Sequence, residues 1–80
     1  MNTTEHLKAL DLAKAGQWDE AHRKVQTQSD ALSCLIHGYL HRVEGDLGNA
    51  RYWYGRADAE LPDTTLPEEW DRLYRLAGAE

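Results

Sequence analysis

The segment from residue 32 to residue 57, LSCLIHGYLHRVEGDLGNARYWYGRA, constrains the fold of this chain more than any other. Its first half is apolar nearly all the way round a helix, and one broad stripe consists of Leu32, Leu35, Ile36, Leu40 and Val43. A helix without a polar face is normally buried on several sides. We therefore expect it at the centre of the molecule. A tight acidic corner, Glu44-Gly45-Asp46, then predicts a turn into another helix.

The remaining segments also have helical spacing, and none shows the alternation of a strand. We expect an all-α fold of about five helices in one domain, residues 1–80. Two antiparallel helical hairpins are predicted at residues 3–28 and 30–61, with Pro62 ending the second. A C-terminal capping helix is predicted at residues 67–78.

The predicted C-terminal helix has one apolar face and one polar face. The inward set is Trp70, Leu73, Leu76 and Ala77. The residues expected mostly outward are Glu68, Glu69, Asp71, Arg72 and Arg75. Its expected target is the open side of the second hairpin, where Trp53 or Leu61 would meet Trp70.

Charge and cysteine content exclude several classes of function. The net charge of −5 argues against binding to nucleic acid or to an anionic membrane surface. The single cysteine, Cys34, permits no intramolecular disulfide and predicts a buried thiol in a reducing compartment. The N-terminus has neither the charged nor the apolar region of a signal peptide. We expect a soluble cytoplasmic protein.

Two segments of the chain match each other. Gly16-Gln17-Trp18-Asp19-Glu20-Ala21 and Gly45-Asp46-Leu47-Gly48-Asn49-Ala50 share a glycine, a large apolar residue and an alanine at the same spacing. This pattern resembles the tetratricopeptide repeat family. The resemblance covers roughly residues 3–62 and implies paired helices that act as a protein-interaction module.

In that family, the first helix of each unit lines a concave peptide-binding groove. The resemblance therefore implies a groove here, formed by His6, Leu10, Ala13, Lys14, Leu35, Tyr39 and Arg42. Within it, Lys14 and Arg42 could clamp a carboxylate.

A second candidate site lies on the central helix. His37 and His41 are four residues apart and project from one side, with Glu44 one turn further on. Two imidazoles and a carboxylate on one face could hold a divalent metal. The alternative is a pair of hydrogen-bonded interior histidines, bonded to Asp46, Asn49 or a tyrosine.

A third candidate is an aromatic and basic cluster, which consists of Arg51, Tyr52, Trp53 and Arg56. Aromatic residues and arginine are enriched in binding hot spots. Alternatively, Trp53 packs in the core against Trp70.

The sequence contains no complete catalytic set, so we expect a non-enzymatic interaction module without a cofactor. Its expected partner is a protein or peptide, or a second copy of the chain in a homodimer. The alternative function is metal or ligand binding by His37, His41 and Glu44.

Overall fold

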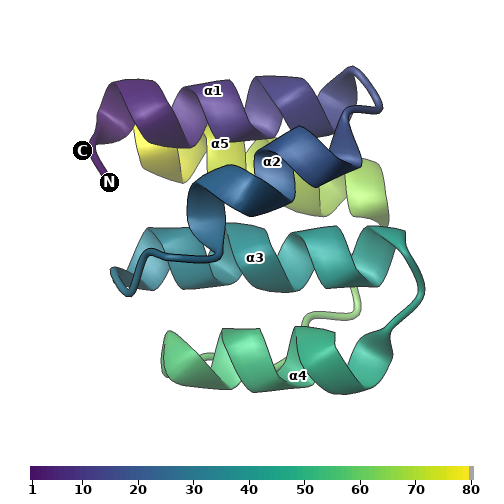
Figure 1. Cartoon of the computed structure of the whole chain (residues 1–80). Coiled ribbons are helices and arrows are strands. Elements are labelled where there is room, and N and C mark those ends of the chain that lie inside the picture. The colour runs from purple at the N-terminus through teal and green to yellow at the C-terminus, as the bar shows by residue number, and fades with distance from the viewer. Residues whose placement is uncertain (80) are drawn as a thin grey trace.

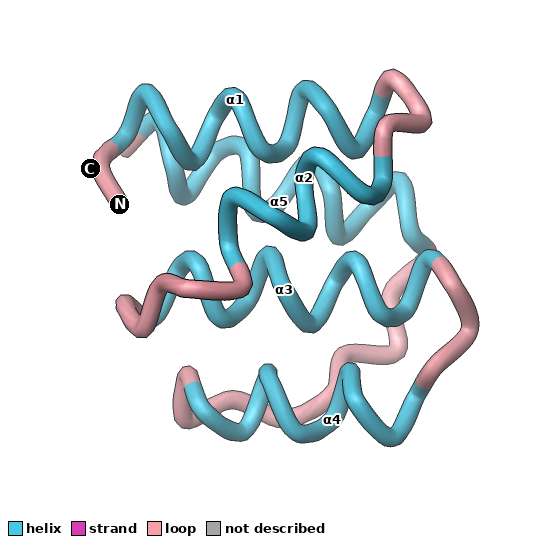
Figure 2. The backbone as a smooth tube through the Cα atoms, viewed as in Figure 1, coloured by secondary structure: helices cyan, strands magenta, loops and turns pink. Residues whose placement is uncertain are grey.

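A computed structural model describes residues 1–79 and confirms the predicted all-α fold for them (Figures 1 and 2). The five helices of this described part are α1 (Thr3–Lys14), α2 (Trp18–Val25), α3 (Ala31–Val43), α4 (Leu47–Arg56) and α5 (Leu66–Gly78). None of them is long and apolar enough to cross a membrane.

Helix α3 is the centre of the fold, as its composition predicts. It contacts each of the other four helices, and Cys34, Ile36, Tyr39 and Leu40 are buried on it. The last residue of the expected apolar stripe is not buried. Val43 is 44% exposed because it lies in the last turn, at the open α3–α4 corner.

The two glycine corners have the same backbone structure. Gly16 and Gly45 adopt φ values of +80° and +84°, which residues with a Cβ disfavour. Gln17 N–H bonds to Leu12 O, and Asp46 N–H bonds to His41 O, at the equivalent positions. Both corners are therefore helix ends of the Schellman type, and each one reverses the chain into the following helix.

Helix α4 is shorter than the sequence predicts. The expected hairpin runs to residue 61, but α4 ends at Arg56. Asp58 adopts φ +59°, and Ala59 N–H bonds back to Tyr54 O. This helix end stops α4 before Pro62, and the chain then crosses to α5 without a helix.

The predicted position of the last helix is wrong. Helix α5 packs against α1 and α3 instead of covering the α3–α4 hairpin. Trp70 donates from Nε1 to Leu10 O of α1 at 2.8 Å and stacks on Tyr74, so it does not meet Trp53. The change follows from the early end of α4, which leaves a loop long enough to carry α5 to the other side of α3.

The faces of α5 are correspondingly rotated. Glu69, expected outward, is fully buried, while Leu76, expected inward, is 41% exposed. Leu73 and Ala77 are buried as predicted. Because Glu69 finds hydrogen-bond partners on α4 and on α5 itself, its burial does not leave a charge unpaired.

Candidate functional site

Three of the four histidines of the chain meet between α2 and α3. His37 and His41 come from successive turns of α3, and their rings stack with centroids 5.0 Å apart. His22 approaches from α2, and its Nε2 lies 3.0 Å from Nε2 of His37. One ring nitrogen of each histidine lies within 4.8 Å of the other two. We call these three residues the histidine cluster.

Two tryptophans form the walls of the histidine cluster. Trp18 stacks on His22 with ring centroids 4.7 Å apart, and its Nε1 donates to Leu40 O at 2.6 Å. Trp53 of α4 stacks on His37 at 3.8 Å. Three helices, α2, α3 and α4, therefore fix the imidazole rings.

Glu44 has a different position from the one the sequence predicts. It is the C-cap residue of α3, and its Oε1 lies 2.6 Å from Nδ1 of His41. It also groups with His41 and Asp46 as a second set of closely spaced ligand atoms. Glu44 therefore occupies Nδ1 of His41, and Nε2 is the nitrogen of that ring that remains for another ligand.

Burial favours the neutral form of two members of the histidine cluster, His22 and His37. The pKa of His37 is lowered to about 4, first by burial and then by the neighbouring His22 and His41. Burial and His41 also lower the pKa of His22. Imidazole binds metals in its neutral form, so near pH 7 these two side chains are in the state that a metal requires.

His37 also has an unsatisfied atom. Its ring is 3% exposed, and Nδ1 has no hydrogen-bond partner among residues 1–79. An unpaired buried polar atom costs about 1–3 kcal/mol. The expected partners Asp46 and Asn49 instead bond to each other at the start of α4.

The aromatic and basic cluster is a surface next to this site. Arg51 and Tyr52 are exposed, Tyr52 by 55%. The guanidinium of Arg56 lies 5.1 Å from the ring centroid of Trp53, and its Nη1 is 3.3 Å from the Tyr52 hydroxyl. Trp53 thus packs on His37 inside the molecule, and it also borders an exposed patch with Arg56.

Among residues 1–79, α5 lies across the face where α1 and α3 meet and so covers much of the predicted groove. Of the seven residues expected to form it, His6, Leu10 and Tyr39 are buried. Arg42 donates to the backbone carbonyl of Thr64, so it does not pair with Lys14 to hold a carboxylate. Lys14 remains exposed over the ring of Trp70.

Sequence reasoning found two members of the histidine cluster and missed His22. The spacing of His37 and His41 on one helix is a local signal, whereas His22 joins them from another helix 15 residues before His37. One sign was available. Residues 18 and 22 are one turn apart on α2, so His22 shares a face with Trp18, the large apolar residue of the first matched segment.

Comparison with known proteins gives no identification. The chain matches no family model, no curated protein and no solved structure.

Proposed function

We propose that this protein binds a transition-metal ion through His22, His37 and His41. The observation that supports this proposal is the convergence of three imidazole rings from two helices, with a nitrogen of each within 4.8 Å of the others. Interior histidines of purely structural function commonly bond to separate acceptors. Here the rings contact one another.

The geometry requires little adjustment to hold an ion. Two nitrogens bound to one tetrahedral Zn²⁺ at about 2.0–2.1 Å lie about 3.3–3.4 Å apart. The Nε2 atoms of His22 and His37 are 3.0 Å apart, so a small side-chain rotation would admit the ion. His22 is half-buried at the edge of the site, and it is the ligand with most freedom to move.

Glu44 would support the site without touching the metal. Histidine ligands commonly donate their other ring nitrogen to a carboxylate, which fixes the ring and makes the ligand more basic. The 2.6 Å contact of His41 Nδ1 with Glu44 has this arrangement and leaves Nε2 of His41 for the ion. Three nitrogen ligands favour zinc, copper, nickel or cobalt over magnesium or calcium.

Titration with Zn²⁺ and Co²⁺ tests the proposal. Untagged protein should bind one ion per chain by calorimetry, and Co²⁺ should develop visible absorption bands of a low-symmetry nitrogen site. His22→Gln should abolish or weaken binding at least about tenfold, since one of three ligands is lost. His22 is the best target because it is the least buried member of the cluster.

His6→Gln is the matched control. His6 is the fourth histidine, and it bonds to Asp30 and Ser33, away from the cluster. The His6→Gln variant should bind metal as the unmodified chain does. Equal metal affinity of His22→Gln and the unmodified chain would contradict the proposal, and so would the absence of any Co²⁺ spectrum at millimolar metal.

A protein-interaction function is the second candidate, and the resemblance to tetratricopeptide repeats and the exposed surface of Tyr52 and Arg56 favour it. The surface consists of the residue types that are enriched at interfaces. The partner we propose is a second copy of the chain. Sedimentation equilibrium should then show a dimer that Tyr52→Ser dissociates. A monomer at high micromolar concentration would exclude it.

A further inference from the structure

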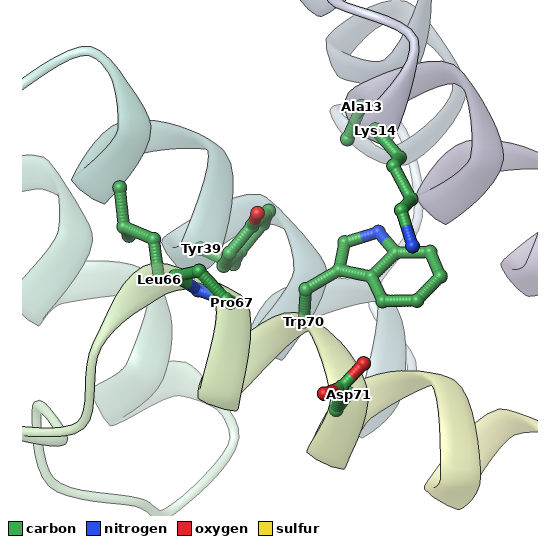
Figure 3. A pocket seen from close by; sticks show the side chains of 7 residues that line it. All are labelled: Ala13, Lys14, Tyr39, Leu66, Pro67, Trp70 and Asp71. Atoms are coloured by element: carbon green, nitrogen blue, oxygen red, sulfur yellow. The ribbon is translucent and has the colours of Figure 1, made fainter.

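A separate cavity of about 360 Å³ lies between α1, α3 and the start of α5. Figure 3 shows its lining residues, which are Ala13, Lys14, Tyr39, Leu66, Pro67, Trp70 and Asp71. This volume is at the lower end of the range of small-molecule sites, which are mostly apolar with a few polar groups that fix orientation. The cavity is what remains of the α1–α3 face after α5 covers it.

Trp70 forms a fixed wall of this cavity. Its Nε1 donates to Leu10 O at 2.8 Å, and its ring stacks on Tyr74 with centroids 4.6 Å apart. The indole therefore cannot turn away without breaking a hydrogen bond. A rigid aromatic wall loses little side-chain freedom when an apolar group packs against it.

Two residues that line this cavity, Lys14 and Tyr39, have polar side-chain groups. The ammonium group of Lys14 lies 4.2 Å from the Trp70 ring centroid (Figure 3), and it forms no ion pair with the residues that the structure describes. The Tyr39 hydroxyl has no hydrogen-bond partner in residues 1–79. A cation and a hydroxyl donor are the groups that bind a carboxylate.

We propose that this cavity binds the carboxylate of a small aromatic or apolar acid. The carboxylate lies between the Lys14 ammonium and the Tyr39 hydroxyl, and the apolar part packs against Trp70, Leu66 and Pro67. Two sources have this chemistry: a free monocarboxylic acid and the C-terminal residue of a peptide. Asp71 also lines the cavity, so its negative charge weakens binding and selects against dicarboxylates.

The experiment uses ¹H–¹⁵N spectra of the chain with EDTA present, so that the result is independent of the histidine cluster. The probe is 3-phenylpropionate, and 3-phenylpropionamide is the neutral control. The acid should shift the Trp70 indole signal in a saturable way. The amide should bind at least about tenfold more weakly, since bonds to an ionised carboxylate are the stronger ones.

Lys14→Met keeps the apolar stem and removes the charge. It should weaken binding of the acid about tenfold and leave binding of the amide unchanged. Lys8→Met is the matched control, because Lys8 is an exposed lysine of the same helix that does not line the cavity. Asp71→Asn should act in the opposite direction and tighten binding of the acid about two- to threefold, because a like charge is removed.

The two sources are separated by a second pair of probes, an N-acetyl-Ala-Phe peptide with a free or an amidated C-terminus. Tighter binding of the free peptide than of 3-phenylpropionate assigns the site to peptide C-termini, and the reverse order assigns it to small acids. The proposal is overturned if the amides bind as well as the acids. It is equally overturned if Lys14→Met and Lys8→Met have the same affinity.

Discussion

The Tyr54 hydroxyl donates a 2.7 Å hydrogen bond to Oε2 of Glu69, and this bond joins α4 to α5. Both side chains are fully buried. Arg72 contacts both oxygens of the same carboxylate, from Nε at 2.7 Å and from Nη2 at 2.8 Å. A buried carboxylate that is paired and fully bonded is stable in this position, so the network holds α5 against the rest of the molecule.

Tyr54→Phe should therefore lower the free energy of unfolding by about 1–2 kcal/mol, because a carboxylate oxygen inside the protein loses a donor. Urea unfolding measures the change. Tyr52→Phe is the matched control. Tyr52 is exposed, so removal of its hydroxyl should change the free energy of unfolding by no more than about 0.5 kcal/mol. An equal effect of the two variants would mean that the buried bond contributes nothing.

Two glycines of the α3–α4 hairpin should respond to alanine with opposite signs. A Cβ on Gly38 would lie 2.7 Å from Cδ2 of Tyr54 and 3.2 Å from Ala50 O, so Gly38→Ala forces the helices apart. It should cost about 1–3 kcal/mol. Gly55 has open space at its Cβ position, and Gly55→Ala should stabilise by about 0.5–1 kcal/mol. Thermal unfolding of both variants checks the difference in sign.

Asp58 is a place where the chain stores a small backbone strain. Its φ of +59° is a left-handed conformation that glycine adopts without penalty. Asp58→Gly should raise stability by about 0.5–1 kcal/mol, and Asp58→Ala should lower it by a similar amount. A lower thermal midpoint for the glycine variant would show that the aspartate side chain stabilises this helix end.

The lowered pKa of Asp30 predicts that the stability of the protein depends on pH. Burial by itself would raise its pKa, but hydrogen bonds from Ser33, the Met1 ammonium and His6 outweigh burial and lower the pKa below its ordinary value of 3.8. The unfolded chain therefore takes up a proton at Asp30 before the folded chain does. The stabilisation is present above about pH 4 and is lost as the pH falls below it.

Asp30→Asn tests this dependence because it keeps an N-cap side chain for α3 and removes the titrating group. Between pH 5 and pH 3 the variant should lose less stability than the unmodified chain. Asp63→Asn, in the exposed loop before α5, is the control and should follow the unmodified chain. Parallel curves for all three proteins would contradict the assignment.

Much of the fold follows from local patterns in the sequence. The apolar spacing of α3 predicts its central position, and the glycines at 16 and 45 predict both corners, because these signals act within a few residues. The position of α5 depends on where α4 ends. That end is a left-handed Asp58, a residue type that only a minority of helix ends use.

The candidate site was predictable only in part, because local patterns do not show how residues of different helices meet. The pair His37 and His41 is visible from spacing within one helix. Whether His22 reaches this pair depends on the orientation of α2 about its axis, which the hydrogen bond from Trp18 to Leu40 O fixes. The spacing of His22, one turn from Trp18, places it on the same side of α2 but does not show that it meets the histidines of α3.

The contact of Trp70 with Leu10 joins residues 60 positions apart in the chain. A ribosome adds about 5–20 residues per second, so α1 waits several seconds for the helix that will cover it. Until then Leu10 and the neighbouring apolar side chains of α1 can pack only on α2 and α3. The nascent chain should therefore be protease-sensitive until α5 leaves the exit tunnel.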